Sequence, residues 1–182
     1  KTDPNYTEAW TALGTLQAYM YSFGLLEATA LDESLANIER AIALEPNSAT
    51  VYAAKANTLL MQKKWEPMFA SLDKAIEISP NNAEVLNAAI FIYVVGGECT
   101  EAQRADINAP KGTHTKGLCQ WQKGFEAGIK ADELDKANTM PTRNFPLANV
   151  YIRGGQWKNA AARLEKVAYP GFFWYELFSG VA

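Results

Sequence analysis

Apolar residues recur every three or four positions between two prolines, Pro46 and Pro80. In the first half of this stretch Ala56 follows Tyr52 by four positions, which places both residues on one face of a helix. The spacing predicts two amphipathic helices, and the short polar connection at Lys63-Lys64 predicts that they pack antiparallel. The second helix carries its apolar stripe at Trp65, Met68, Leu72, Ala75, Ile76 and Ile78. A single hairpin of this kind cannot bury its stripe, so it needs stacked neighbours.

The length of this unit and one short motif point to the same repeat type. The two prolines are 34 residues apart, which is the period of tetratricopeptide (TPR) repeats. Near the start of the chain, Trp10-x-x-Leu13-Gly14 matches the first part of the TPR pattern W-x₂-L-G-x₂-Y, with Gln17 in place of the usual tyrosine. We therefore expect a stack of similar helix pairs.

The repeats are expected in one domain over residues 1–182, which we interpret as cut from a longer protein. Residues 98–118 contain Pro110, Gly112 and several polar residues, so they are predicted to be an insertion in the third repeat. The predicted repeats span about 7–48, 49–82, 83–140 and 141–170, with a partial repeat at 171–182.

An aromatic and aliphatic stretch from Tyr19 to Leu26 makes the first repeat longer than the period. It predicts either a lip that binds a partner or additional core packing. We favour core packing, because large apolar side chains are usually buried.

The chain resembles the TPR family over nearly its whole length. More narrowly, NFPLANVYIRGGQWKNA (residues 144–160) and YPGFFW (residues 169–174) are similar to the repeat region of bacterial membrane-anchored winged-helix transcription regulators and class III adenylate cyclases. The resemblance implies an all-α, right-handed superhelix of antiparallel helix pairs. It also implies a non-catalytic module that binds a protein or peptide segment, as the regulatory part of a bacterial signalling or transcription-regulatory protein.

In TPR arrays the partner binds the concave groove lined by the first helix of each pair. Asn57 and Asn149 hold the place where family members often bind a peptide backbone, although each could equally satisfy local polar groups only. A lysine-based clamp for acidic C-terminal peptides is not expected, because residues such as Ala53 stand where the lysines should be. The resemblance implies a groove lined by Thr11, Thr15, Ala53, Asn57, Leu60, Asn87, Phe91, Val94, Phe145, Asn149 and Arg153.

The sequence offers few candidate catalytic residues. His114 is the only histidine, and it lies in the insertion near Glu98, Glu101 and Asp106, where carboxylates are ordinarily solvated. No nucleophile elbow, glycine-rich phosphate loop or metal-ligand spacing occurs, so we expect no enzyme activity, no cofactor and no metal. The net charge of −3 without a basic cluster argues against nucleic-acid binding. The sequence contains no run of eighteen apolar residues, so we expect no membrane span in this segment.

Cys99 and Cys119 bracket the insertion. They could close it as a disulfide or remain two free thiols, and a metal site with His114 ranks third because a fourth ligand is not evident. The compartment is open as well: a disulfide would favour the periplasm, and free thiols the cytoplasm.

Two further functions stay open at this point. The chain could be a sensory domain that binds a small ligand or metal near residues 98–119. It could also associate with itself as a homodimer through the aromatic helix at Phe172–Phe178.

Overall fold

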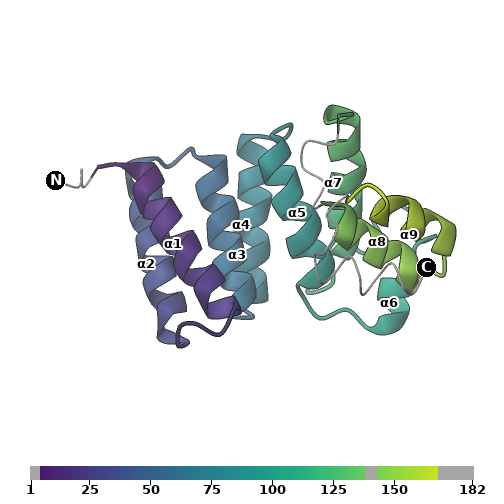
Figure 1. Cartoon of the computed structure of the whole chain (residues 1–182), viewed down its shortest axis with the longest axis horizontal. Coiled ribbons are helices and arrows are strands. Elements are labelled where there is room, and N and C mark those ends of the chain that lie inside the picture. Colours follow the sequence, from purple (N-terminus) through teal and green to yellow (C-terminus); the bar gives the residue numbers. More distant parts are fainter. Residues whose placement is uncertain (1–4, 138–142, 168–182) are drawn as a thin grey trace. The chain divides into compact units, whose positions relative to one another are not determined.

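The computed structural model describes residues 5–137 and 143–167, and every regular element within them is an α-helix (Figure 1). The helices pack as pairs, α1 with α2, α3 with α4 and α8 with α9. The expected fold class, all-α with antiparallel helix pairs, is therefore confirmed. In chain order the helices are α1 (Thr7–Ser22), α2 (Thr29–Leu44), α3 (Ala49–Met61), α4 (Trp65–Ile78), α5 (Ala83–Val95), α6 (Glu101–Ala105), α7 (Trp121–Leu134), α8 (Asn144–Arg153) and α9 (Trp157–Leu164).

The chain divides into two compact units, residues 1–88 and 89–182, with the division inside α5. The first unit contains α1 to α4 and the start of α5. Its apolar stripes meet in two clusters, each built from a buried centre and partly buried residues around it. One cluster contains Ile38, Ala41 and Val51 with Trp10, Ile42 and Ala54, and the other contains Ala49, Ala53, Ala75 and Val85 with Tyr52, Ile76, Ile78 and Ala88.

The glycine of the Trp10-x-x-Leu13-Gly14 motif lets α1 and α2 approach closely. A Cβ atom at Gly14 would lie 2.8 Å from the carbonyl oxygen of Ser34, which real Cβ contacts essentially never show. At the same point the Ser34 hydroxyl donates to the carbonyl oxygen of Gly14 at 2.7 Å. The Ser34 hydroxyl also lies 2.9 Å from the hydroxyl of Thr58 on α3. This buried polar contact therefore joins three helices of the first unit.

The stretch from Tyr19 to Leu26 does not add to the core. Phe23 is 76% exposed, and Tyr19, Leu25 and Leu26 are exposed as well. The prediction of additional core packing is therefore wrong for these side chains. The same side of α1 exposes Leu13 and Leu16, because only the other side of this largely apolar helix meets α2.

Three of the helix pairs are joined by the same turn. Gly24, Lys63 and Gly155 each follow the first helix of their pair with positive φ angles of 71°, 55° and 70°. The next residue then donates its N–H to a carbonyl five residues back, as in the Schellman motif. These bonds run from Leu25 to Met20 (2.9 Å), from Lys64 to Leu59 (3.0 Å) and from Gln156 to Tyr151 (2.8 Å).

The second unit contains the end of α5, the insertion and α7 to α9. The insertion includes a short helix, α6, which the sequence analysis did not predict. Thr100 and Gln103 start α6 as a capping box: the Gln103 N–H donates to the Thr100 hydroxyl at 3.2 Å, and the Thr100 N–H donates to the Gln103 side chain at 2.9 Å.

A buried ionic cluster joins α7, α8 and α9. The Arg143 side chain is only 3% exposed, and its guanidinium donates to Asp132 at 3.0 Å and to Asp135 at 2.7 Å. Arg163 on α9 donates to the other oxygen of the Asp132 carboxylate. A buried charge is tolerated when it is paired and hydrogen-bonded in this way.

Candidate partner-binding site

The predicted groove residues of the first unit differ in the surface that they offer. Thr11, Thr15 and Asn57 are half-buried, and the Thr11 hydroxyl donates to the carbonyl of Thr7 on its own helix. Ala53 and Leu60 are each only 7% exposed. The latter two side chains belong to the packed interior of the unit and leave little surface for a partner.

α5 carries three predicted groove residues, of which Phe91 is the exposed one. Asn87, in the first unit, is half-buried, and its Oδ1 atom is buried without a hydrogen-bond partner in the described structure. Val94, in the second unit, is buried. On α8, Phe145 and Asn149 are half-buried, whereas Arg153 is exposed.

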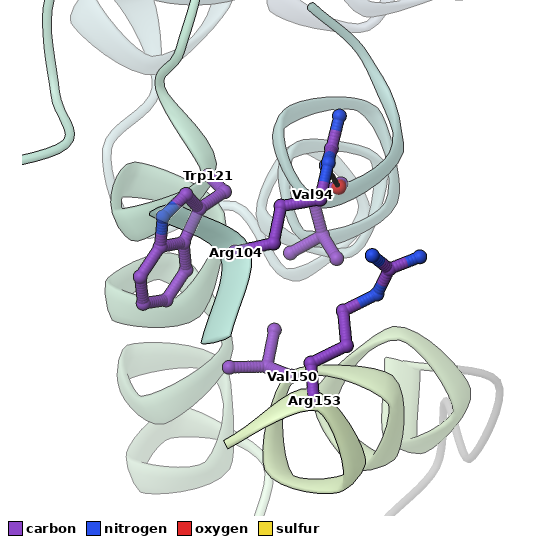
Figure 2. Close-up of a pocket in the computed structure, with 5 residues that line it drawn as sticks. All are labelled: Val94, Arg104, Trp121, Val150 and Arg153. Carbon is purple, nitrogen blue, oxygen red and sulfur yellow. Dashed lines mark hydrogen bonds between the residues drawn. The ribbon is translucent and has the colours of Figure 1, made fainter. Parts of the chain in front are cut away.

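Two of these predicted positions, Val94 and Arg153, meet at a hollow in the second unit. Arg104, Trp121 and Val150 complete its lining (Figure 2). Val94, Trp121 and Val150 are the buried centre of an apolar cluster that also includes Phe125 and Ile107. The hollow is partly open to solvent and has no enclosed space for even one water molecule. A site for a small-molecule ligand usually has about 300–1,000 Å³, so the hollow is too small for one.

Arg104 comes from α6 in the insertion and caps the end of α5. Its guanidinium donates to the carbonyl oxygens of Val94 at 2.5 Å and Gly97 at 3.4 Å. These carbonyls lie at the C-terminal end of a helix, where a cation is favoured. Burial lowers the pKa of the Arg104 guanidinium, the positive charge of Arg153 lowers it further, and the negative charge of Glu101 opposes both effects.

Arg153 ends α8 and reaches the insertion from the other side. Its guanidinium donates to the Asn149 side chain at 2.9 Å and to the Glu101 carboxylate at 2.5 Å. Asn149, predicted to bind a peptide backbone, therefore holds Arg153 in place. The Arg153 side chain is 34% exposed and that of Glu101 is 82% exposed, so this ion pair faces solvent.

The insertion that supplies Arg104 and Glu101 is held by a disulfide. Cys99 and Cys119 are joined with an S–S distance of 2.16 Å and a Cα–Cα distance of 4.7 Å. With both sulfurs in this bond, neither cysteine offers a thiolate to a metal. No group of three or more His, Cys, Asp or Glu side chains in the described residues is placed to hold a metal ion.

One glutamine organises the rest of the insertion. The Gln122 side chain accepts from the N–H groups of Gly112 (2.9 Å) and His114 (3.3 Å), and it donates to the carbonyls of Ala109 (3.3 Å) and Pro110 (3.2 Å). This fixes the loop that packs over Trp121.

The single histidine packs on the same tryptophan. The His114 ring stacks on the Trp121 ring with centroids 5.7 Å apart, and its Nε2 atom lies 3.3 Å from the Asp106 carboxylate. Asp106 is therefore a hydrogen-bonding partner of His114 within the insertion, and both residues help to hold its shape.

Sequence reasoning missed Arg104, Glu101 and Trp121 as residues of this site, and it missed the role of Gln122. The one available signal was Thr100-Glu101-Ala102-Gln103, which has the spacing of a capping box and predicts a helix start. Phe172–Phe178, the predicted dimerisation segment, lies outside the described residues. In the part of the chain that the structure covers, no helix has the length and apolarity to cross a bilayer.

Comparison with known proteins bears on the fold alone. No protein-family model matches the sequence, and no curated protein matches it. The chain is similar to a solved structure titled "Crystal structure of MamA", with a TM-score of 0.55, 16% identity, and coverage of 91% of this chain and 78% of the other. It is also similar to "MamA RS-1 ArsTM double mutant", with a TM-score of 0.54, 19% identity, and coverage of 91% and 75%. MamA contains TPR repeats, so the shared architecture and the helix pairs described above identify a TPR-like helical repeat fold.

Proposed function

We propose that this chain is a non-catalytic interaction module that binds a segment of a protein partner. TPR-like repeats act as protein-interaction modules, and the similarity to MamA supports that general role here. The observation that carries the proposal is the convergence of Val94 from α5 and Arg153 from α8, with its partner Asn149, at one surface hollow. Protein partners offer extended segments that can lie across an open surface, so they do not need the enclosed cavity that a small-molecule ligand usually occupies.

Peptide selection with the full chain tests this proposal. A random-peptide library displayed on phage is selected on the immobilised chain, and recovered peptides are measured by fluorescence polarisation. We expect saturable binding that Asn149→Ala weakens, because the Asn149 side chain holds Arg153. Lys158→Ala on α9 is the control, since Lys158 is exposed and belongs to none of the predicted groove positions. Failure to select any binding peptide, or equal binding by both variants, contradicts the proposal.

The cellular context is a finer proposal. We propose that the module regulates a larger bacterial signalling or transcription-regulatory protein, and the support is the resemblance of residues 144–160 and 169–174 to the repeat regions of winged-helix regulators and class III adenylate cyclases. Reading the complete gene for a winged-helix or cyclase domain tests it. A gene that encodes TPR repeats alone would favour a free adaptor instead.

A further inference from the structure

The surface beside the hollow carries two arginines and one carboxylate. Arg104 directs its hydrogen bonds to the carbonyl oxygens of Val94 and Gly97, which have no net charge. Arg153 donates to the carboxylate of Glu101. Together Arg104, Arg153 and Glu101 leave one positive charge that is not neutralised within the group.

The two guanidinium groups are near enough for the charge of one to affect the other. Figure 2 shows both on the same side of the hollow, with the Trp121 ring on the opposite side. The positive charge of Arg153 is one of the causes that lower the pKa of Arg104. Both side chains are already ordered by hydrogen bonds, Arg104 to α5 and Arg153 to Asn149. Binding there needs little further loss of side-chain freedom.

One side of the hollow is apolar. Val94, Trp121 and Val150 form a buried apolar wall next to the arginines.

Glu101 is paired with Arg153, but this ion pair is exposed and holds Glu101 only weakly. Its side chain is 82% exposed, and an exposed ion pair contributes little to stability. A carboxylate delivered by another molecule can take its place on Arg153 at small cost to the fold. Glu101 then acts as a resident competitor for that site.

We propose that Arg153, supported by the charge of Arg104, binds an Asp or Glu side chain of the partner's segment, and that this carboxylate displaces Glu101. The inference rests on the proposed interaction function. A side-chain carboxylate fits because a planar guanidinium binds a planar carboxylate through paired hydrogen bonds. A nucleic acid fits poorly, because the chain has a net charge of −3 and this site offers only two arginines.

The proposed site differs from the lysine-based clamp that the sequence argues against. That clamp requires lysines on the first helices, where residues such as Ala53 stand. Here part of the positive charge comes from Arg104 on α6, inside the insertion that the Cys99–Cys119 disulfide closes.

The test uses the full chain and the peptides selected as described above. We expect an Asp or Glu to recur at one position among the selected peptides, and we expect its replacement by the matching amide to weaken binding about tenfold, as for a charge-assisted hydrogen-bonded pair. In Arg153→Gln the acid and the amide peptide should bind equally, because the partner of the carboxylate is gone. Lys158→Gln, which removes the same charge from an exposed position on α9, should leave the tenfold difference intact.

Glu101→Gln separates this site from a general electrostatic effect. Loss of the resident competitor should tighten binding of the acidic peptide by about two- to fivefold, the range of an exposed ion pair, and leave the amide peptide unchanged. Raising the ionic strength from about 0.1 M to about 1 M shortens the screening length from about 10 Å to about 3 Å. This should weaken binding of the acidic peptide more than binding of the amide peptide.

Peptides that bind without an acidic position overturn this inference and leave the proposed function standing. The same holds if the acid-to-amide difference persists in Arg153→Gln, or if Glu101→Gln leaves the affinity of the acidic peptide unchanged. Recovery of no binding peptide at all overturns the proposed function, and this inference with it.

Discussion

Lys63 holds a backbone conformation that suits glycine, and this allows a stabilising substitution. Its φ angle is 55°, and the equivalent positions in two other turns are Gly24 and Gly155. The turn geometry is otherwise the same, because all three make the same closing hydrogen bond. We therefore expect Lys63→Gly to stabilise the chain.

The change in free energy of unfolding expected for Lys63→Gly follows from two opposing effects. An L-residue in the left-handed region costs about 1–2 kcal/mol relative to its ordinary conformation. Glycine costs about 0.5–1 kcal/mol more than other residues in lost chain entropy. The net gain for Lys63→Gly is about 0.5–1 kcal/mol. The reverse change, Gly155→Ala, should destabilise by a similar amount, since a Cβ atom there meets nothing within 4 Å and only the backbone is strained.

Urea unfolding followed by tryptophan fluorescence and circular dichroism measures both variants, with the midpoint and slope fitted together. Lys64→Gly is the matched control, because Lys64 is the adjacent residue and has a negative φ of −92°. Lys64→Gly adds only the entropy that glycine loses on folding, so it should destabilise the chain. If Lys63→Gly destabilises the chain as much as Lys64→Gly does, the positive φ angle of Lys63 is not strained and the reasoning is refuted.

Three further predictions concern packing and covalent structure. Arg143→Met removes the buried partner of Asp135 and should lower the free energy of unfolding by about 3–5 kcal/mol, and a loss below about 1 kcal/mol in urea unfolding would show that the cluster is not buried in solution. Gly14→Ala places a methyl group 2.8 Å from the Ser34 carbonyl and should cost about 1–3 kcal/mol in the same assay; an unchanged midpoint would mean that α1 and α2 separate easily. Mass spectrometry without reductant should find the Cys99–Cys119 disulfide, whose reduction should destabilise by about 3 kcal/mol for a loop of this length, and a count of two free thiols in the unreduced protein would contradict it.

Most of the helix pairs could be predicted from the sequence because their signal is periodic. The stripe from Trp65 to Ile78 spans four turns, enough to define one face, and α4 has these bounds. By contrast α6 has five residues, too few for a periodic pattern. The exposed stretch around Phe23 was mispredicted because composition shows which residues are apolar and does not show which side of a helix its neighbours cover.

The candidate site was only partly predictable, because long-range contacts build it. Arg153 was identified from its position in the repeat, but its partner Glu101 lies 52 residues earlier in the chain. No local pattern reports such a pairing. The burial of Arg143 was equally hidden, since a charged side chain is expected at the surface unless its partners are known.

The serine hydroxyl that joins α1, α2 and α3 has a consequence for how the first unit comes apart. Ser34 bonds to Gly14 at 2.7 Å and lies 2.9 Å from Thr58. If the first hairpin detached from the second, Ser34 would keep its bond to Gly14 and Thr58 its bond to the carbonyl of Ala54 at 3.3 Å, but the contact between the two hydroxyls would break. Detachment would also expose the apolar cluster in which Ile38 and Ala41 of α2 pack with Val51 of α3. The two hairpins should therefore lose their amide-exchange protection together, as one cooperative block, and the first should not fray away ahead of the second.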